Sequence, residues 1–399
     1  MHNNIDWINV NDEFESLGEF SLSSDLKNNL KGILTYKNGQ ALLRLFDKFS
    51  EFSNINRTIY GKIICKENNK IYVRLNEVYL VNNWKIKGCN YAYKTSNIDL
   101  SENSFDEKFE IHEAVTFIPE VSYLLKDSFE IIDLSDSKDN DFDSSFTPTS
   151  LSDTRDSLNR FDEKRLNLYT TFNTTFNSKL FNEYLQRVLH LISLFACQIP
   201  SVLSIVYNSK DRNKSFVHLD SNLRVLSNNP KEVLGALTNF KDKISVMFKK
   251  ISANDMNRLT TDFYYGIDNN LNPEVELINY AGAIEYYVAG KRYSNGRSIK
   301  NFSKKLSYFI DQIPFTVIRN DKKDFIKSIK DTRDYLLHGD KKNSEFLLHG
   351  IKLMEYDDDL KKLIYCFIMS KLGLSEEYIN FLSNSFRDGY GLKYYRMNY

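Results

Sequence analysis

The sequence predicts an α+β protein, in which an N-terminal antiparallel β-sandwich or barrel-like domain is followed by an all-α C-terminal half. Short segments of alternating apolar residues fill the first part of the chain, and apolar residues at helical spacing fill the second. The 399 residues exceed what one hydrophobic core usually serves, so we expect two or three folded domains. The predicted divisions are a β-rich domain, a linker, a helical middle region and a helical bundle, at 1–132, 133–158, 159–270 and 271–399.

The β-rich domain opens with a hairpin pattern. Apolar segments at 32–36 and 41–46 flank an Asn38-Gly39 pair. Asn-Gly supplies two residues with positive φ, which the tight turn of a hairpin requires. The same scheme recurs around a predicted Asn68-Asn69 turn, and further strand-like segments follow at 79–81 and 90–93.

The linker at 133–158 is rich in aspartate and serine and has few large apolar residues to bury. Such a composition is typical of a solvated linker or long loop. Its aspartates do not suggest calcium, because a calcium-binding loop needs glycine at its sixth position and glutamate at its twelfth. No glycine-rich phosphate loop, nucleophile elbow or His-Glu-x-x-His motif occurs, so we expect neither a cofactor nor a metal.

Helical periodicity begins after Asn159. One apolar helix face runs from Leu180 to Phe195, before Pro200. Four more predicted helices follow, at 275–289, 299–310, 325–337 and 347–372.

The charge balance and the cysteines of the sequence indicate which partners and which compartment to expect. Lysine plus arginine and aspartate plus glutamate number 53 each, so no global positive field attracts nucleic acid or an acidic membrane, and any RNA contact is local. Four scattered cysteines indicate a reducing compartment. The N-terminal residues lack a basic start followed by an apolar run. We therefore expect a cytoplasmic protein that makes no membrane contact.

The strongest candidate for chemistry is Arg333 with His338, where the fourth helical pattern stops at Gly339. Five steps on an ideal helix turn by about 140°, so the two side chains share a face only if the helix loosens before the glycine. A similar spacing links Arg212 to His218, but there the pattern predicts a loop followed by a short strand. The helical context therefore favours Arg333 and His338.

An arginine followed by a polar residue, three further residues and a histidine, at the end of the third helix of a C-terminal four-helix bundle, resembles the motif of HEPN ribonucleases. The helix that carries Glu285 is similar to the first HEPN helix, and the segment at 347–372 to the closing one. The N-terminal half, with its segments at 32–36 and 59–61 before β-hairpins, resembles that of the ApeA family of abortive-infection, antiphage proteins.

The resemblance implies metal-independent RNA cleavage, in which the ribose 2′-hydroxyl attacks the adjacent phosphorus. Arg333 would hold the scissile phosphate, and His338 would act as acid or base or position the phosphate. Asp334, at the polar position after the arginine, would orient one of the two. Glu285 and Tyr335 are candidate supporting residues, with Tyr335 either stacking on a base or packing in the bundle.

The resemblance also implies partners: an RNA substrate, with transfer RNA as one candidate, a second copy of the chain or a higher homo-oligomer, and a phage protein as a candidate trigger. Two other readings stay open. His338 could cap the helix while Arg333 pairs with Asp334 or Glu285, or the bundle could be a non-catalytic dimerisation or adaptor module. The β-rich domain would then bind a ligand or protein, and in either case it could serve as a sensor or regulatory part. The basic and aromatic run at 386–396 either contacts single-stranded RNA or packs on its own domain or on a partner subunit.

Overall fold

The computed structural model describes most of the chain, and the chain divides into two compact units. The β unit comprises Met1–Phe181 and Pro200–Lys231, and the helical unit comprises Asn182–Ile199 and Glu232–Tyr399. The described residues are 13–49, 57–64, 70–81, 91–105, 109–118, 121, 131–134, 141–149, 165–196, 200, 202–210, 214–220, 242–268, 271–315, 317–339 and 347–386.

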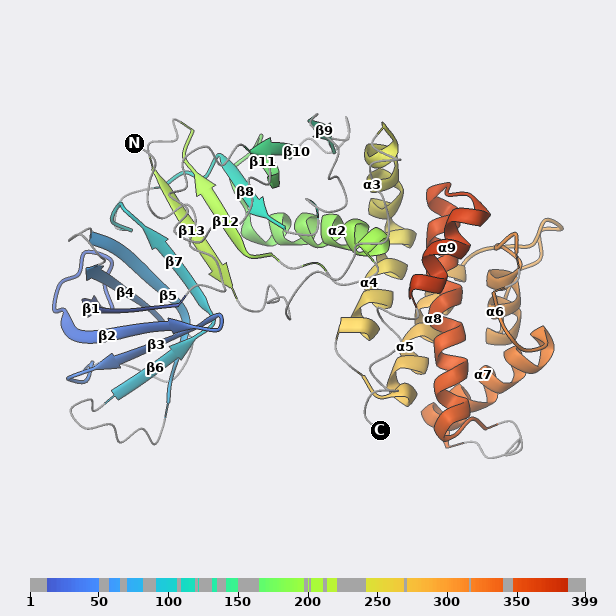
Figure 1. The fold of residues 1–399 in the computed structure, drawn as a ribbon. Helices are drawn as coiled ribbons and strands as arrows, with labels where there is room; N and C mark the ends of the chain where they lie inside the picture. Colours follow the sequence, from blue (N-terminus) through green and yellow to red (C-terminus); the bar gives the residue numbers. More distant parts are fainter. Residues whose placement is uncertain are drawn as a thin grey trace. The chain divides into compact units, whose positions relative to one another are not determined.

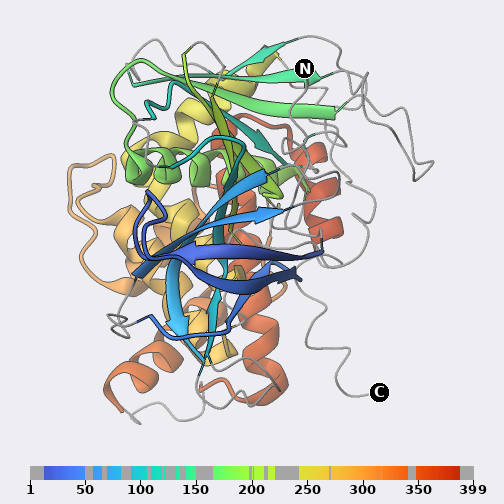
Figure 2. The ribbon, with the colours of Figure 1, turned by 90° about the vertical axis from the view of Figure 1, so that its left-hand side faces the viewer.

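Six antiparallel strands of the β unit close into a barrel, in the order β1-β2-β3-β6-β5-β4, with β4 pairing back onto β1 (Figure 1). These strands face the viewer, in blue, in Figure 2. Their bounds are Phe14–Ser21, Leu30–Lys37, Gln40–Leu45, Arg57–Ile64, Lys70–Leu80 and Tyr91–Thr95 for β1 to β6. The predicted α+β class, with a barrel-like N-terminal domain, is confirmed.

The turn between β2 and β3 has the predicted form. Asn38 and Gly39 have φ values of 52° and 72°, and Lys37 pairs with Gln40 across the two-residue loop. Positive φ at both central residues matches the right-handed twist of the flanking strands. The turn predicted at Asn68-Asn69 lies outside the described residues.

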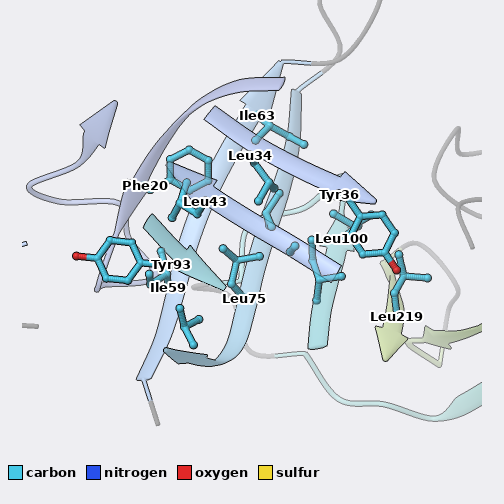
Figure 3. Packing of buried hydrophobic residues seen from close by; sticks show 14 of the residues in the cluster. Phe20, Leu34, Tyr36, Leu43, Ile59, Ile63, Leu75, Tyr93, Leu100 and Leu219 are labelled. Atoms are coloured by element: carbon cyan, nitrogen blue, oxygen red, sulfur yellow. The ribbon is translucent and has the colours of Figure 1, made fainter. Parts of the chain in front are cut away.

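Alternate residues of each strand fill the barrel interior (Figure 3). Phe20, Leu34, Leu43 and Val73 are fully buried there. Burying each such side chain stabilises the fold by about 1.5–3 kcal/mol relative to exposing it. Gly61 lies against the Phe20 ring so closely that a Cβ atom would overlap it, which explains why a strand interior contains glycine at this place.

The sheet continues beyond the barrel from β5. That strand turns at Glu77, whose φ is 53°, so its first part pairs with β7 while its end pairs with β6. From β5 outward the order is β7-β13-β12-β8-β11-β10-β9, all antiparallel. The bounds of these strands, in that order, are Asn97–Ser101, Ser215–Asp220, Ser204–Asn208, Glu113–Phe117, Arg165–Phe172, Phe142–Thr149 and Ile132–Asp133.

These added strands correct the secondary structure expected for the middle of the chain. The region at 159–270 is not helical throughout, because it contributes β11, β12 and β13, and the expected linker at 133–158 contains β10. The two strands β12 and β13 pair with β8 and β7, which lie about a hundred residues earlier. Segments of five to eight residues that are stabilised by such distant partners carry little local signal. The short strand predicted at His218 is β13.

A row of charged side chains crosses three neighbouring strands of this sheet. The buried carboxylate of Asp99 on β7 lies 2.7 Å from Arg74 Nε on β5 and 2.7 Å from His218 Nδ1 on β13. Asn76 also donates to Asp99, at 2.8 Å. Burial alone would raise the pKa of Asp99, but the neighbouring His218 and Arg74 and the hydrogen bonds lower it below its usual value.

We expect Asp99→Asn to lower the free energy of unfolding by about 2 kcal/mol at neutral pH, because charge-assisted hydrogen bonds to Arg74 and His218 are lost. A carboxyl with a lowered folded-state pKa contributes stability above about pH 4 and loses it as the pH falls through the folded value. The difference from wild type should therefore narrow below about pH 4.

The difference in the free energy of unfolding between Asp99→Asn and wild type is measured by hydrogen exchange of the β7 and β13 peptides. The measurement is made in a urea series at several pH values. Asp47→Asn, at an exposed site of the same unit, is the matched control. A deficit of equal size at pH 3 and pH 7 would contradict the role of the Asp99 charge.

The described helices α2 to α9 lie from Ser178 onward, in the part of the chain where helical periodicity was predicted. Asn272, Asn301 and Asp321 cap α5, α6 and α7 by accepting backbone N–H bonds with their side chains. The bounds of α2 to α9 are Ser178–Ala196, Ile244–Ser252, Asn254–Asp268, Pro273–Val288, Phe302–Ile310, Lys322–His338, Gly350–Leu372 and Glu376–Phe386.

The last long helix, α8, packs against the other helices of the bundle (Figure 1). Its Phe367 lies 4.2 Å from Phe309 of α6 between ring centroids, and its Tyr356 stacks on Phe325 of α7 at 5.5 Å. Tyr365 donates to the Leu194 carbonyl of α2 at 2.7 Å. No helix in the described ranges has the length and apolar character needed to cross a membrane.

Three buried ionisable groups lie between α5 and α8. Lys361 Nζ is 3.5 Å from a Glu276 oxygen and 3.8 Å from an Asp357 oxygen, and each of the three side chains is 4% exposed. Burial and the neighbouring Glu276 raise the pKa of Asp357 well above its usual value, although Lys361 opposes this rise. Protonation of Asp357 is therefore easier than protonation of an exposed aspartate.

Candidate functional site

Helix α7 carries the predicted site residues, and it is held at both ends. The Asp321 carboxylate accepts from the backbone N–H groups of Lys323 and Asp324, at 2.8 and 3.3 Å. At the other end Gly339 adopts a left-handed φ of 70° and donates to the Tyr335 carbonyl at 2.8 Å. A capped helix with a packed inner face presents its outer side chains from a fixed backbone.

The Arg333 guanidinium is bound by three helices. Its Nη2 lies 2.5 Å from Glu285 Oε2 on α5, and its Nη1 lies 3.2 Å from Asp334 Oδ1 on α7 itself. Its Cζ is 4.7 Å from the centroid of the Phe302 ring, at the start of α6. The side chain is 18% exposed, so part of it is accessible to a ligand.

The charges around Arg333 balance one another. Glu285 also binds Lys305 at 2.9 Å, and Lys330 binds Asp331 at 3.0 Å and Asp334 at 3.1 Å. Hydrogen bonds to these two aspartates raise the pKa of Lys330. Three cations thus face three carboxylates, and a phosphate that binds Arg333 has to compete with Glu285.

The structure does not bring His338 to Arg333. His338 is the last residue of α7 and is exposed, and its imidazole makes no hydrogen bond or ion pair with a described residue. The loosening expected before Gly339 does not occur, because α7 remains helical through His338. Hydrogen bonding between Gly339 and Tyr335 completes the last turn and keeps the two side chains about 140° apart around the helix axis.

The other predicted residues have simpler surroundings. Asp334 lies between Arg333 and Lys330, and Tyr335 is half-buried and accepts the Gly339 bond with its carbonyl. Two contacts of the Arg333 site were not predicted, Phe302 and Lys305. The only local signal for Phe302 is its place as the first apolar residue after the Asn301 cap.

The other arginine–histidine spacing noted in the sequence links Arg212 to His218. His218 lies on β13 with Asp99, in the charged row described above, and Arg212 lies outside the described residues. Among the described residues, no group of three or more histidine, cysteine, aspartate or glutamate side chains is arranged to hold a metal ion.

Helix α7 carries Arg333 and, five residues later at its end, His338, the spacing by which the sequence resembles HEPN domains. Residues 278–378 match the family model described as Apea-like HEPN, a region that extends from α5 into α9. The C-terminal region of this chain is an Apea-like HEPN domain, as its resemblance predicted. No curated protein and no solved structure matches the chain.

Proposed function

We propose that the helical unit is a metal-independent endoribonuclease that acts in antiphage abortive infection. The observation that carries the proposal is the arrangement of Arg333, which is fixed by Glu285 and Phe302 yet partly exposed, near the end of the same helix as an exposed His338. The match of this region to the Apea-like HEPN family supports it.

In the proposed reaction the ribose 2′-oxygen bonds to the adjacent phosphorus while the bond from phosphorus to the 5′-oxygen breaks. A base takes the 2′-hydroxyl proton, an acid gives a proton to the departing 5′-oxygen, and a cyclic phosphate and a 5′-hydroxyl result. A planar guanidinium with several N–H donors suits Arg333 for stabilising the phosphorane charge. An imidazole can both accept and donate a proton, which suits His338 for moving the proton. Asp334 would hold the guanidinium plane, with Glu285 in the same supporting role, and Tyr335 lies where it could support a base.

The angle between Arg333 and His338 gives a reason to include a second copy of the chain. Since the two side chains of one α7 diverge, we propose that two copies pair and that each copy completes the other's phosphate site. Leu337 next to His338 is 44% exposed, and Ile351 at the start of α8 is 70% exposed. Apolar side chains exposed beside a catalytic group are suited to an interface. The β unit would act as the sensor, with a phage protein as trigger and cellular RNA, including transfer RNA, as substrate.

One observation favours a second function. Arg333 is neutralised by Glu285 and Asp334, the arrangement expected if the arginine only stabilises the bundle. In that case the bundle would be a non-catalytic dimerisation or adaptor module, and the β unit would bind a ligand or protein.

Substituting His338 with alanine tests the two functions. Because His338 is exposed and unpaired with any described residue, we expect His338→Ala to leave the thermal midpoint unchanged and to slow RNA cleavage by about 10²-fold or more. Cleavage is measured with purified full-length protein in EDTA, by detecting new cyclic-phosphate ends, and in infected cells by RNA integrity.

His349→Ala, at an exposed histidine before α8, is the matched control. If the wild-type protein protects infected cells but cuts no RNA, either in those cells or in vitro, the adaptor function is supported and the nuclease function is wrong. Equal cleavage by wild type and His338→Ala would exclude His338 from the chemistry.

A further inference from the structure

The connection between α5 and α6 concentrates positive charge in a chain with no net charge. We call residues 289–305, which comprise this connection and the first turn of α6, the basic loop. No acidic residue occurs between Glu285 and Asp311, whereas the whole chain balances 53 basic against 53 acidic residues. The basic loop contains Lys291, Arg292, Arg297, Lys300, Lys304 and Lys305.

The basic loop has a defined backbone. A β-bridge joins Arg292 to Ser298, and Tyr293 donates to the Arg297 carbonyl at 3.0 Å. Gly296 closes the turn with a φ of 78° and donates to the Tyr293 carbonyl at 2.9 Å. The Tyr293 ring packs edge-on against Tyr308 of α6 at 6.0 Å. The loop therefore presents its cations from a fixed backbone.

Four of the six cations are available for a ligand. Arg292, Arg297, Lys300 and Lys304 are exposed, and none of them forms an ion pair within the part of the chain that the structure describes. The Arg292 side chain donates to the Gly296 carbonyl at 3.4 Å, which leaves its charge uncompensated. A cluster of four such charges produces a local positive potential that attracts polyanions.

The remaining two cations connect the basic loop to its surroundings. Lys291 lies 3.8 Å from an Asp255 oxygen and over the Tyr287 ring, with its nitrogen 3.1 Å from the centroid. Lys305 binds Glu285, the same carboxylate that binds Arg333.

The basic loop leads directly to Arg333. Phe302 lies within it, and its ring packs against the Arg333 guanidinium. Phe302 and Lys305 therefore connect the basic loop to the Arg333 site, through the Phe302 ring and the shared Glu285 carboxylate.

Two aromatic side chains lie within the basic loop or just before it in the sequence. Tyr293 is half-buried within the loop. Tyr286, on the last turn of α5, is 55% exposed, and the Arg258 guanidinium lies 5.4 Å from its ring centroid. Exposed aromatic rings next to a basic groove stack the bases of single-stranded nucleic acids, which a base-paired duplex does not offer. An acidic polypeptide would use the cations but would not require the rings.

We propose that the basic loop binds the phosphodiester backbone of single-stranded RNA and places it beside Arg333. The inference rests on the proposed function only for the choice of RNA and for the role of Arg333. It assigns substrate recruitment to a surface within one chain, so strand binding does not depend on the pairing of two copies.

The test is binding of a fluorescent single-stranded RNA that carries 2′-O-methyl groups and so cannot be cleaved. Full-length wild type is compared by anisotropy with the triple variant Arg292→Ala, Arg297→Ala, Lys300→Ala over a salt series. We expect the variant to bind about tenfold or more weakly near 0.1 M salt, and the slope of log K against log salt to fall by about 2, since each lost phosphate contact contributes about 0.7. Tyr286→Ala should weaken binding without changing the slope.

The matched control removes three exposed cations from other parts of the helical unit: Lys243→Ala, Lys249→Ala, Lys323→Ala. This control should bind within about twofold of wild type, and circular dichroism should give the same spectrum for all variants. The proposal is overturned if the loop variant binds like wild type, if the control loses as much affinity, or if duplex RNA or polyglutamate competes as well as single-stranded RNA.

Cleavage of ordinary RNA by the same proteins separates this proposal from the proposed function. If wild type binds RNA through the basic loop but cuts none, the nuclease function fails and the binding surface stands. If wild type cuts RNA and the loop variant binds and cuts equally well, the binding surface fails and the nuclease function stands.

Discussion

Replacing Arg333 with alanine is expected to slow RNA cleavage by about 10³-fold while the bundle stays folded. The guanidinium is the cation proposed to stabilise the phosphate as negative charge develops on it, and no other described cation occupies its position between Glu285 and Phe302. Its removal leaves Glu285 bound to Lys305, so no carboxylate is stranded there. Because the ion pair with Glu285 is partly exposed, its loss should cost no more than about 1 kcal/mol of stability.

Single-turnover cleavage rates and thermal midpoints of the full-length protein measure both effects. Arg333→Lys keeps the charge but loses the planar, two-pronged geometry, so it should recover only part of the rate. Arg187→Ala removes an arginine that donates to the Glu183 carbonyl of its own helix, α2, and it should cut RNA at the wild-type rate. The catalytic role of Arg333 is wrong if Arg333→Ala cuts RNA as fast as Arg187→Ala. If the activity and the stability of Arg333→Ala fall in parallel, Arg333 has only a structural role.

Lys361→Met is expected to lower the free energy of unfolding of the helical unit by about 3–5 kcal/mol at neutral pH. Lys361 is the cation that faces Glu276 and Asp357 in the bundle core, and its removal leaves a buried carboxylate without a counter-charge. Burial alone would lower the pKa of Lys361, but Asp357 and Glu276 outweigh burial and raise it. The ammonium therefore stays charged in the fold and supplies that counter-charge.

The loss in free energy of unfolding that Lys361→Met causes should depend on pH in a defined direction. The folded-state pKa of Asp357 is raised, so the stability that its protonation contributes is present below about pH 4 and is lost as the pH rises through the folded value. Without Lys361, which opposes this rise, the pKa of Asp357 should be raised further. Lys361→Met should therefore be nearest to wild type in acid and furthest from it at neutral pH.

Guanidinium unfolding between pH 4 and pH 8, followed by circular dichroism at 222 nm, measures the predicted trend. The double variant Glu276→Gln, Lys361→Met removes charge of both signs and should recover much of the loss, because it no longer leaves the Glu276 carboxylate buried without a counter-charge. Lys352→Met, at an exposed position of the same helix, is the control. A wild-type midpoint for Lys361→Met at pH 7 would contradict the buried ion pair.

The sequence predicts those parts of the fold that depend on neighbouring residues. Asn38 and Gly39 specify a turn by their own backbone preferences, and Gly339 marks the end of α7 in the same way. The strands β12 and β13 were harder to predict, because each is stabilised by a partner far away in the chain. A short apolar segment alone does not reveal such a partner.

The same distinction applies to the candidate site. The position of Arg333 before a helix end follows from its own helix, and its pairing with Glu285 was one of the predicted alternatives. The contact with Phe302 depends on how α6 packs against α7, which no residue spacing encodes. We expected a loosened helix end to bring Arg333 and His338 to one face, and this expectation was wrong. A glycine cap can complete the last helical turn without unwinding it.

The division of the chain at Phe181, Ile199 and Lys231 limits how this protein can be shortened or recombined. Strands β12 and β13 complete the sheet only after α2 has been made, and α2 in turn provides the His190 and Leu194 carbonyls that accept hydrogen bonds from Tyr264 and Tyr365. A fragment that starts at Glu232 would lack those acceptors, and one that stops at Phe181 would lack two inner strands. A single crossover in the gene therefore cannot exchange one unit and leave the other intact.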